Sequence, residues 1–97
     1  MPPVTRLGDD CTGHGSFPPR PSNGGSGNVF VNGIPVHRQG DGWAPHGSKS
    51  PSPPHGSTLS SGSGTVFVNG KQCGRIGDPV ACGSAVAVGS SNVFAGG

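Results

Sequence analysis

The stretch GNVFVNGIPVHRQGD, residues 27–41, recurs almost unchanged as GTVFVNGKQCGRIGD at residues 64–78. Each copy places a short β-branched and aromatic run directly before an Asn-Gly pair. Asn-Gly is the strongest short signal for a β-hairpin, because both turn residues accept a positive φ. The repeated unit is therefore predicted to be a strand, a tight turn, a returning strand and then a loop after Gly-Asp. The expected strands cover 29–31 and 34–38 in the first copy, and 66–68 and 71–76 in the second.

A third copy is divided between the two ends of the chain. The C-terminal SSNVFAGG, residues 90–97, matches SGNVFVNG at residues 26–33. The N-terminal PVTRLGD, residues 3–9, matches PVHRQGD within the first copy. The third hairpin would thus have its first strand at the end of the chain and its second strand at the beginning.

This division predicts that the termini pair, with Asn92 to Ala95 antiparallel to Pro3 to Leu7. Three equivalent hairpins that close through the termini imply a single closed all-β domain over residues 1–97 with pseudo-threefold symmetry. An open meander of duplicated hairpins is the alternative, but it leaves the divided third copy unexplained.

The composition permits only a small hydrophobic core. The 97 residues include 20 glycines and 11 prolines, and only 29% are hydrophobic. Without the repeat, such a composition would indicate disorder. A folded chain of this kind needs a disulfide, a metal ion or a partner chain to stabilise it.

Charge and hydropathy exclude several classes of function. The formal net charge is only +2, with no basic run, which argues against a nucleic-acid partner. No apolar stretch is long enough to span a membrane. The N-terminal MPPVTRLGDD lacks the apolar segment of a secretory signal peptide, so we expect synthesis in the cytoplasm and export by another route.

Potential metal ligands follow each Gly-Asp at near-equivalent distances: a histidine five residues on in two loops, and a cysteine four residues on in the third. Loops related by threefold symmetry should converge near the axis. A further histidine lies in the Ser/Pro/Gly segment 47–63, which can fold back across the axis. Three imidazoles and one thiolate form a closed tetrahedral set suited to one structural Zn²⁺ per chain, with iron as the second choice. The predicted ligands are His14, His46, His55 and Cys82.

Other residues could compete for these roles. Cys11 lies close to His14 in the sequence, so a Cys11–Cys82 disulfide or a site built on Cys11 and His37 stays open. His37 falls on a predicted strand and is not expected to bind metal. Cys73 takes a strand position that is valine in the other copies, and is interpreted as a small buried apolar residue.

Three Arg-x-x-Asp pairs, one in each copy, could suggest catalysis. An aspartate after glycine at a strand end more commonly bonds local backbone amides, and the arginine can reach the neighbouring repeat. Catalytic zinc keeps an open position and usually a carboxylate base, yet the chain has no glutamate and only Asp10 lies outside the pairs. We therefore expect no enzymatic activity. The pairs are Arg6/Asp9, Arg38/Asp41 and Arg75/Asp78.

PVTRLGD, PVHRQGD, CGRIGD and the VFVNG hairpins together resemble the PAAR-repeat proteins over nearly the whole chain. Val-Thr-Arg, Val-His-Arg and Cys-Gly-Arg stand here where Ala-Ala-Arg is typical of that family. The resemblance implies a small sharp cone with a metal-stabilised apex, whose zinc is held by three histidines and one cysteine. These ligands would again be His14, His46, His55 and Cys82.

The resemblance further implies a structural protein that caps and sharpens the spike of a contractile injection machine for piercing a membrane. The expected partners are a trimeric β-helical spike protein, with one tip per trimer, and the target cell envelope; no small-molecule substrate is expected. The protein would act at the baseplate tip of a phage tail or leave the cell through a type VI secretion machine. Since no effector domain accompanies the repeats, the chain resembles a bare tip.

The alternative is a free-standing, metal-stabilised β-module or adhesin without a spike partner. The physical argument favours capping, because a trimeric spike ends in open strand edges that a single pseudo-threefold chain can cover together. Alternation along each Val-Phe-Val-type run puts the phenylalanine on the face opposite its neighbours. Whether the valine face or the phenylalanine face meets the partner stays open.

Overall fold

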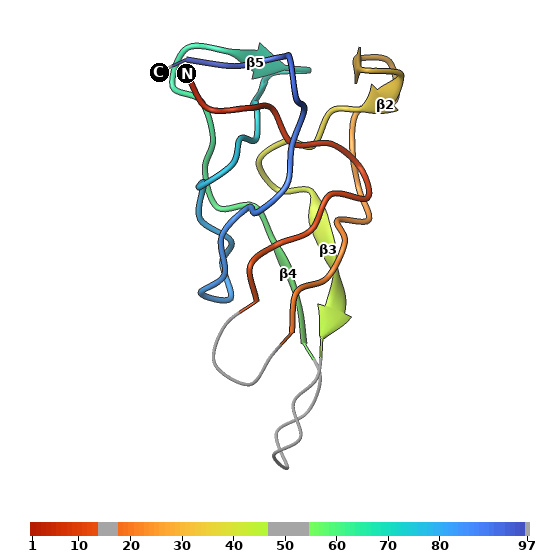
Figure 1. Ribbon diagram of the computed structural model, residues 1–97, viewed down its shortest axis with the longest axis vertical. Coiled ribbons are helices and arrows are strands. Elements are labelled where there is room, and N and C mark those ends of the chain that lie inside the picture. The colour runs from red at the N-terminus through yellow and green to blue at the C-terminus, as the bar shows by residue number, and fades with distance from the viewer. Residues whose placement is uncertain (14–17, 47–54, 97) are drawn as a thin grey trace.

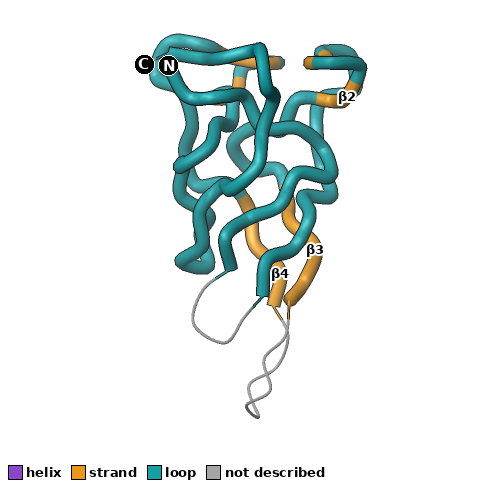
Figure 2. The backbone as a smooth tube through the Cα atoms, viewed as in Figure 1, coloured by secondary structure: helices purple, strands orange, loops and turns teal. Residues whose placement is uncertain are grey.

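The structure, a computed structural model, describes residues 1–13, 18–46 and 55–96, with the backbone alone for 45, 46, 55 and 56. In this part of the chain, three two-stranded antiparallel sheets are joined by long irregular connections (Figures 1 and 2). The small all-β class is therefore as predicted. The strands are β1 Phe30–Val31, β2 Ile34–Pro35, β3 Gly42–His46, β4 His55–Thr58, β5 Phe67–Val68 and β6 Lys71–Gln72.

The two complete hairpins turn on their Asn-Gly pairs, as predicted. Asn32 and Gly33 have φ values of 56° and 76°, and Asn69 and Gly70 have 54° and 78°. A positive φ at both turn residues gives the twist that matches two antiparallel strands. β1 therefore pairs with β2, and β5 with β6, in the same register.

The termini complete the third hairpin. Pro3 and Phe94 form an antiparallel bridge. The Val4 amide donates to the Val93 carbonyl at 2.9 Å, and the Ala95 amide donates to the Pro2 carbonyl at 3.1 Å. The two ends lie side by side at the end of the molecule that carries β5 and β2 (Figure 1). The predicted pairing of the termini is confirmed for residues 2–4 with 93–95, whereas Thr5 and Leu7 donate to the Gly74 and Pro35 carbonyls of the other repeats.

The returning strands are much shorter than predicted. β2 and β6 each end after two residues, whereas strands were expected to reach residues 38 and 76. The chain then leaves its own hairpin and bridges to the neighbouring repeat. The inter-repeat bridges, Val36 with Arg6, Cys73 with Arg38 and Val4 with Arg75, form a closed cycle.

A closed ring of three backbone hydrogen bonds lies between these bridges. The His37 amide donates to the Thr5 carbonyl at 3.1 Å, and the Gly74 amide donates to the His37 carbonyl at 3.0 Å. The Thr5 amide completes the ring by donating to the Gly74 carbonyl at 3.0 Å. The three residues occupy equivalent positions of the three repeats, so this axial ring marks the pseudo-threefold axis.

Three further hairpins follow the repeats toward the opposite end of the molecule. We call these the first, second and third apex hairpins: segments 9–13 and 18–23, strands β3 and β4, and residues 79–85. Sequence reasoning expected loops at all three places; β3–β4 is instead a hairpin with an irregularity between Trp43 and His46.

The apex hairpins also close into a ring. The Ala44 amide donates to the Pro21 carbonyl at 3.0 Å, which joins the second hairpin to the first. The Ala81 amide donates to the Thr58 carbonyl at 2.9 Å, which joins the third to the second. The Thr12 amide donates to the Ala85 carbonyl at 2.7 Å, which joins the first to the third. The threefold arrangement therefore extends from the repeats to the apex hairpins.

Among the described residues, the apolar core consists of two small clusters, one on either side of the axial ring. His37 lies between them, since it follows Val36 of one cluster and its ring contacts Trp43 of the other. Cys73 is only 2% exposed, which confirms its interpretation as a buried apolar residue. The repeat cluster contains Val4, Val36, Val68, Cys73 and Ala95; the apex cluster contains Cys11, Trp43, Leu59, Val80 and Val86.

Gly74 is predicted to tolerate no side chain. A Cβ atom there would lie 2.8 Å from Leu59 Cδ2, 2.9 Å from Thr5 Cγ2 and 3.0 Å from the His37 carbonyl oxygen. Overpacking of this kind typically costs about 1–3 kcal/mol. Gly74→Ala should lower the free energy of unfolding by this amount in urea titrations. Gly27→Ala, where a Cβ meets open space, is the matched control, and equal midpoints for the two variants would contradict the prediction.

Candidate functional site

Each Arg-x-x-Asp pair forms a compact clamp at the start of an apex hairpin. Asp9 Oδ2 accepts from the backbone amide and from Nε of Arg6, both at 2.9 Å, while Oδ1 accepts from Arg6 Nη2 at 3.3 Å. The same bonds recur in the other two pairs. Because each carboxylate is engaged in these local bonds, the clamps brace the chain, as predicted.

The remaining arginine nitrogen reaches the neighbouring repeat, which confirms the second part of that prediction. Arg6 Nη1 donates to Asn32 Oδ1 at 3.1 Å, and Arg38 Nη1 donates to Asn69 Oδ1 at 3.0 Å. The divided third copy has Gly96 in place of the turn asparagine, and Arg75 Nη1 donates to the Gly96 carbonyl at 3.0 Å. A backbone carbonyl thus replaces the side chain where the termini meet.

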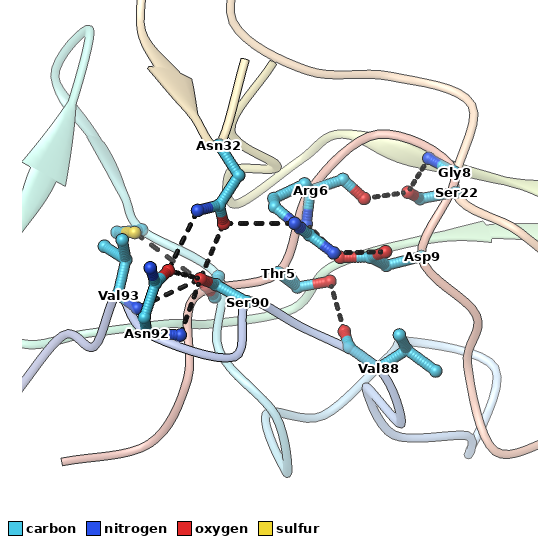
Figure 3. A network of polar contacts seen from close by, with 12 residues as sticks. Thr5, Arg6, Gly8, Asp9, Ser22, Asn32, Val88, Ser90, Asn92 and Val93 are labelled. Carbon is cyan, nitrogen blue, oxygen red and sulfur yellow. Dashed lines mark hydrogen bonds and ion pairs between the residues drawn. The ribbon is translucent and has the colours of Figure 1, made fainter. Parts of the chain in front are cut away.

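A serine before each first strand completes this polar ring, and Figure 3 shows the example of Ser90. The Ser90 hydroxyl donates to Asn32 Oδ1 at 2.6 Å and accepts from the Val93 amide at 3.0 Å, while Asn32 Nδ2 donates to Asn92 Oδ1 at 2.9 Å. Ser26 bonds Asn69 in the same way, and Ser63 donates to the Gly96 carbonyl. Each hairpin turn is therefore tied to the start of another hairpin.

Electrostatics keep the Arg38/Asp41 clamp charged. Partial burial alone would raise the pKa of Asp41, but the hydrogen bonds from Arg38 outweigh it and hold this pKa below its ordinary value. The same bond raises the pKa of Arg38. The pair stays ionised across the neutral pH range.

Each of the three hairpins at the end of the molecule that carries the termini exposes a phenylalanine, and we call this end the apolar face. Phe30, Phe67 and Phe94, one from each repeat, are 54%, 56% and 47% exposed. The residues that follow them point inward and belong to the repeat cluster or pack against it: Val31, Val68 and Ala95. The phenylalanines therefore do not fill the cone, and this settles which side of each run is interior.

The described members of the predicted ligand set lie on two of the apex hairpins, the second and the third. His14 lies outside the described residues. His46 ends β3 and His55 begins β4, and their Cα positions are direct partners across the ladder. Cys82 lies in the turn of the third apex hairpin, where it is half-buried against the apex cluster. Within the residues that the structure describes, no three His, Cys, Asp or Glu side chains are gathered around a common point.

The rival assignments find no support in the described residues. Cys11, Cys73 and Cys82 are all free, so the Cys11–Cys82 disulfide is absent. Cys11 is 2% exposed within the apex cluster. His37 Nδ1 is hydrogen-bonded to the Gly24 carbonyl at 2.8 Å, so this ring nitrogen is already engaged.

His37 forms a buried aromatic pair with Trp43 that sequence reasoning missed. The ring centroids are 4.1 Å apart and the planes are tilted by 59°. His37 is fully buried, and its Nε2 and the indole nitrogen of Trp43 have no hydrogen-bond partner in the described structure. Burial lowers the pKa of His37, despite opposing contributions from the Gly24 carbonyl and Asp41.

The lowered pKa of His37 predicts a loss of stability in mild acid. The unfolded chain takes up a proton near the ordinary value of 6.5, whereas the folded chain resists protonation until lower pH. The stability that depends on a neutral His37 is therefore fully present above pH 6.5. It is lost as the pH falls from that value through the pKa of His37 in the folded chain. Urea titrations from pH 8 to 5, followed by fluorescence of the single tryptophan, should show a steeper loss for the wild type than for His37→Gln. Parallel curves would contradict the assignment.

Comparison with known families agrees with this geometry. The family model described as PAAR motif matches residues 12–88, most of the chain, while no curated protein matches it. The described residues include no helix capable of spanning a membrane. The family is associated with structural proteins at the spike tips of contractile injection systems. With three matching repeats, a closed threefold ring and a family match over this length, the chain belongs to the PAAR motif family.

Proposed function

We propose that one copy of this chain caps the end of a trimeric β-helical spike in a contractile injection machine and sharpens it for piercing a membrane. The observation that carries the proposal is the apolar face, which presents Phe30, Phe67 and Phe94 once per repeat. Family membership supports the same role, at the tip of a phage tail or of a type VI secretion spike. We expect the chain to have no turnover of its own.

Symmetry explains why a single chain suits this task. A trimer ends in three equivalent sets of strand edges, and the three hairpins offer one similar partner to each subunit. Phe30 and Phe67 pair with equivalent residues across their hairpins, and Phe94 bridges to Pro3 at the corresponding place. The three aromatic side chains therefore repeat around the axis as the subunits of a trimer do.

Rigidity of the apolar face favours binding. The hydrogen bonds that tie the hairpin turns to the serines and arginines fix the backbone beneath the phenylalanines. A preorganised surface loses little conformational entropy on association. Large half-exposed apolar side chains gathered on one face of a small protein indicate an interaction surface.

Charged substitutions on this face should weaken capping. Phe30→Asp and Phe67→Asp should each weaken binding to a trimeric spike fragment by about 30-fold or more, the usual effect of losing an interface anchor. Val88→Asp is the control, since Val88 is 42% exposed but lies outside the three hairpins. Native mass spectrometry should find one chain per wild-type trimer. Three chains per trimer, or no complex, would disprove the role, and the second result would favour a free-standing module.

We further infer that His14, His46, His55 and Cys82 hold one structural Zn²⁺. The donor set of three imidazoles and one thiolate suits zinc in a closed tetrahedral site. Two features support the fit: the backbone pairing of His46 with His55, and the free, half-buried thiol of Cys82 on a neighbouring hairpin. A metal here would tie the second and third apex hairpins together where the apolar cluster is small.

Removal of one ligand should release the metal and destabilise the fold. The wild type should purify with about one Zn²⁺ per chain, and Cys82→Ser should lose most of it. Since binding free energy of a structural metal is folding free energy, Tm should fall by roughly 10–20 °C, as expected for a loss of about 2–3 kcal/mol in a domain of this size. Elemental analysis and thermal unfolding with and without EDTA measure both effects. His37→Gln is the control that should retain the metal.

A wild-type protein without bound metal would contradict the zinc site but leave the capping role untouched. Unchanged metal content in Cys82→Ser would contradict the ligand assignment alone.

A further inference from the structure

The contact between the first and third apex hairpins is continuous along the backbone. Cys11 and Val86 form an antiparallel bridge, and the Ala87 amide donates to the Asp10 carbonyl at 3.0 Å. Further along, the Thr12 amide donates to the Ala85 carbonyl at 2.7 Å. The two segments therefore run side by side up to residue 12.

Two hydroxyl groups close the end of this contact. The Gly13 amide donates to Ser84 Oγ at 2.9 Å, and the Ala85 amide donates to Thr12 Oγ1 at 3.1 Å. Thr12 Oγ1 donates its hydrogen to the Gly13 carbonyl at 2.9 Å. In the 3.2 Å contact between the two hydroxyls, Ser84 Oγ is therefore the donor and Thr12 Oγ1 the acceptor. Ser84 is 4% exposed. We call Thr12 and Ser84 the hydroxyl clasp.

In the part of the chain that the structure describes, the clasp has no counterpart at the other two contacts of the apex ring. Among the described residues, the first and second hairpins are joined by backbone bonds such as Ala44 to Pro21. The second and third are likewise joined by backbone bonds such as Ala81 to Thr58. Side-chain hydroxyls are thus concentrated at one contact of the three.

The position of the clasp relates it to the proposed metal ligands. Thr12 precedes His14 by two residues, and Ser84 follows Cys82 by two residues. Gly83, between Cys82 and Ser84, has a φ of 104°, so the turn that carries the thiol bends sharply just before the clasp. Fixing Ser84 therefore fixes the turn on which Cys82 lies.

We propose that Thr12 and Ser84 are positioning residues for the metal site: they hold the third apex hairpin against the first and so set the placement of the Cys82 thiolate. This inference rests on the proposed zinc site. A tetrahedral ion binds tightly when its ligands are already placed, since ordering them otherwise opposes binding. Residues beyond the ligands commonly change metal affinity by about 10–100-fold.

Thr12→Val and Ser84→Ala test the clasp. Thr58→Val and Ser60→Ala are matched controls, because both hydroxyls are exposed on the adjacent contact and make no side-chain hydrogen bond in the described structure. Competition with a chromophoric chelator measures Zn²⁺ affinity, and the thiolate-to-cobalt absorption band of the Co²⁺ form reports the Cys82 bond. The clasp variants should bind Zn²⁺ about 10–100-fold more weakly, with a shifted or weakened cobalt band. The controls and Thr12→Ser should remain close to the wild type.

Each remaining outcome overturns the inference in a distinguishable way. Clasp variants that match the wild type in affinity and cobalt spectrum overturn the positioning role alone. Variants that lose stability without metal yet keep the wild-type cobalt band reduce the clasp to a structural contact. A wild-type protein that binds neither Zn²⁺ nor Co²⁺ overturns both the zinc site and the positioning role of the clasp. The capping proposal is tested separately by native mass spectrometry and is not affected by this result. Should Ser84→Ala fail to fold, Thr12→Val carries the test, since Thr12 is exposed.

Discussion

The axial ring of backbone hydrogen bonds among Thr5, His37 and Gly74 is the constraint on which the rest of the fold depends. Two small apolar clusters could not by themselves hold three separate hairpins in register. The ring joins them through directional bonds that also satisfy buried backbone groups. Space at the axis is limited. Of the three equivalent positions, His37 therefore carries a large side chain, Thr5 a small one and Gly74 none. The sequence departs from symmetry there because three imidazole rings could not share one axis.

Outside the axis, polar side chains provide what a larger core would provide elsewhere. Each arginine clamp both braces its own repeat and reaches the next one, and each serine fixes the start of a strand. Because these bonds form a closed cycle, the three hairpins are held as one rigid end. The phenylalanines are left free to face outward, where they form the surface that the capping proposal uses.

At the apex end of the molecule, hydrogen bonds again provide what a larger apolar core would provide, but most of them come from the backbone. The apex hairpins join through backbone bonds at every contact, and through the hydroxyl clasp at one. The apex cluster is small and contains the unpartnered indole of Trp43 beside the buried His37. Further contacts between the apex hairpins would therefore stabilise this end of the fold. A structural metal, and a clasp that positions its thiolate ligand, are both consistent with that need.

The sequence by itself determined the turns, the three copies, the pairing of the termini and the bracing role of the Arg/Asp pairs, because these depend on short-range geometry and on an evident repeat. Only the tertiary structure decided the rest. β2 and β6 end early because inter-repeat pairing replaces pairing within the hairpin, and β3–β4 formed where loops were expected. Alternation puts Phe30 and Val31 on opposite faces of the strand but does not reveal which face is buried. That depends on which face the other segments pack against in the folded chain. The His37–Trp43 pair and the hydroxyl clasp join residues distant in sequence, where neither spacing nor composition carries a signal.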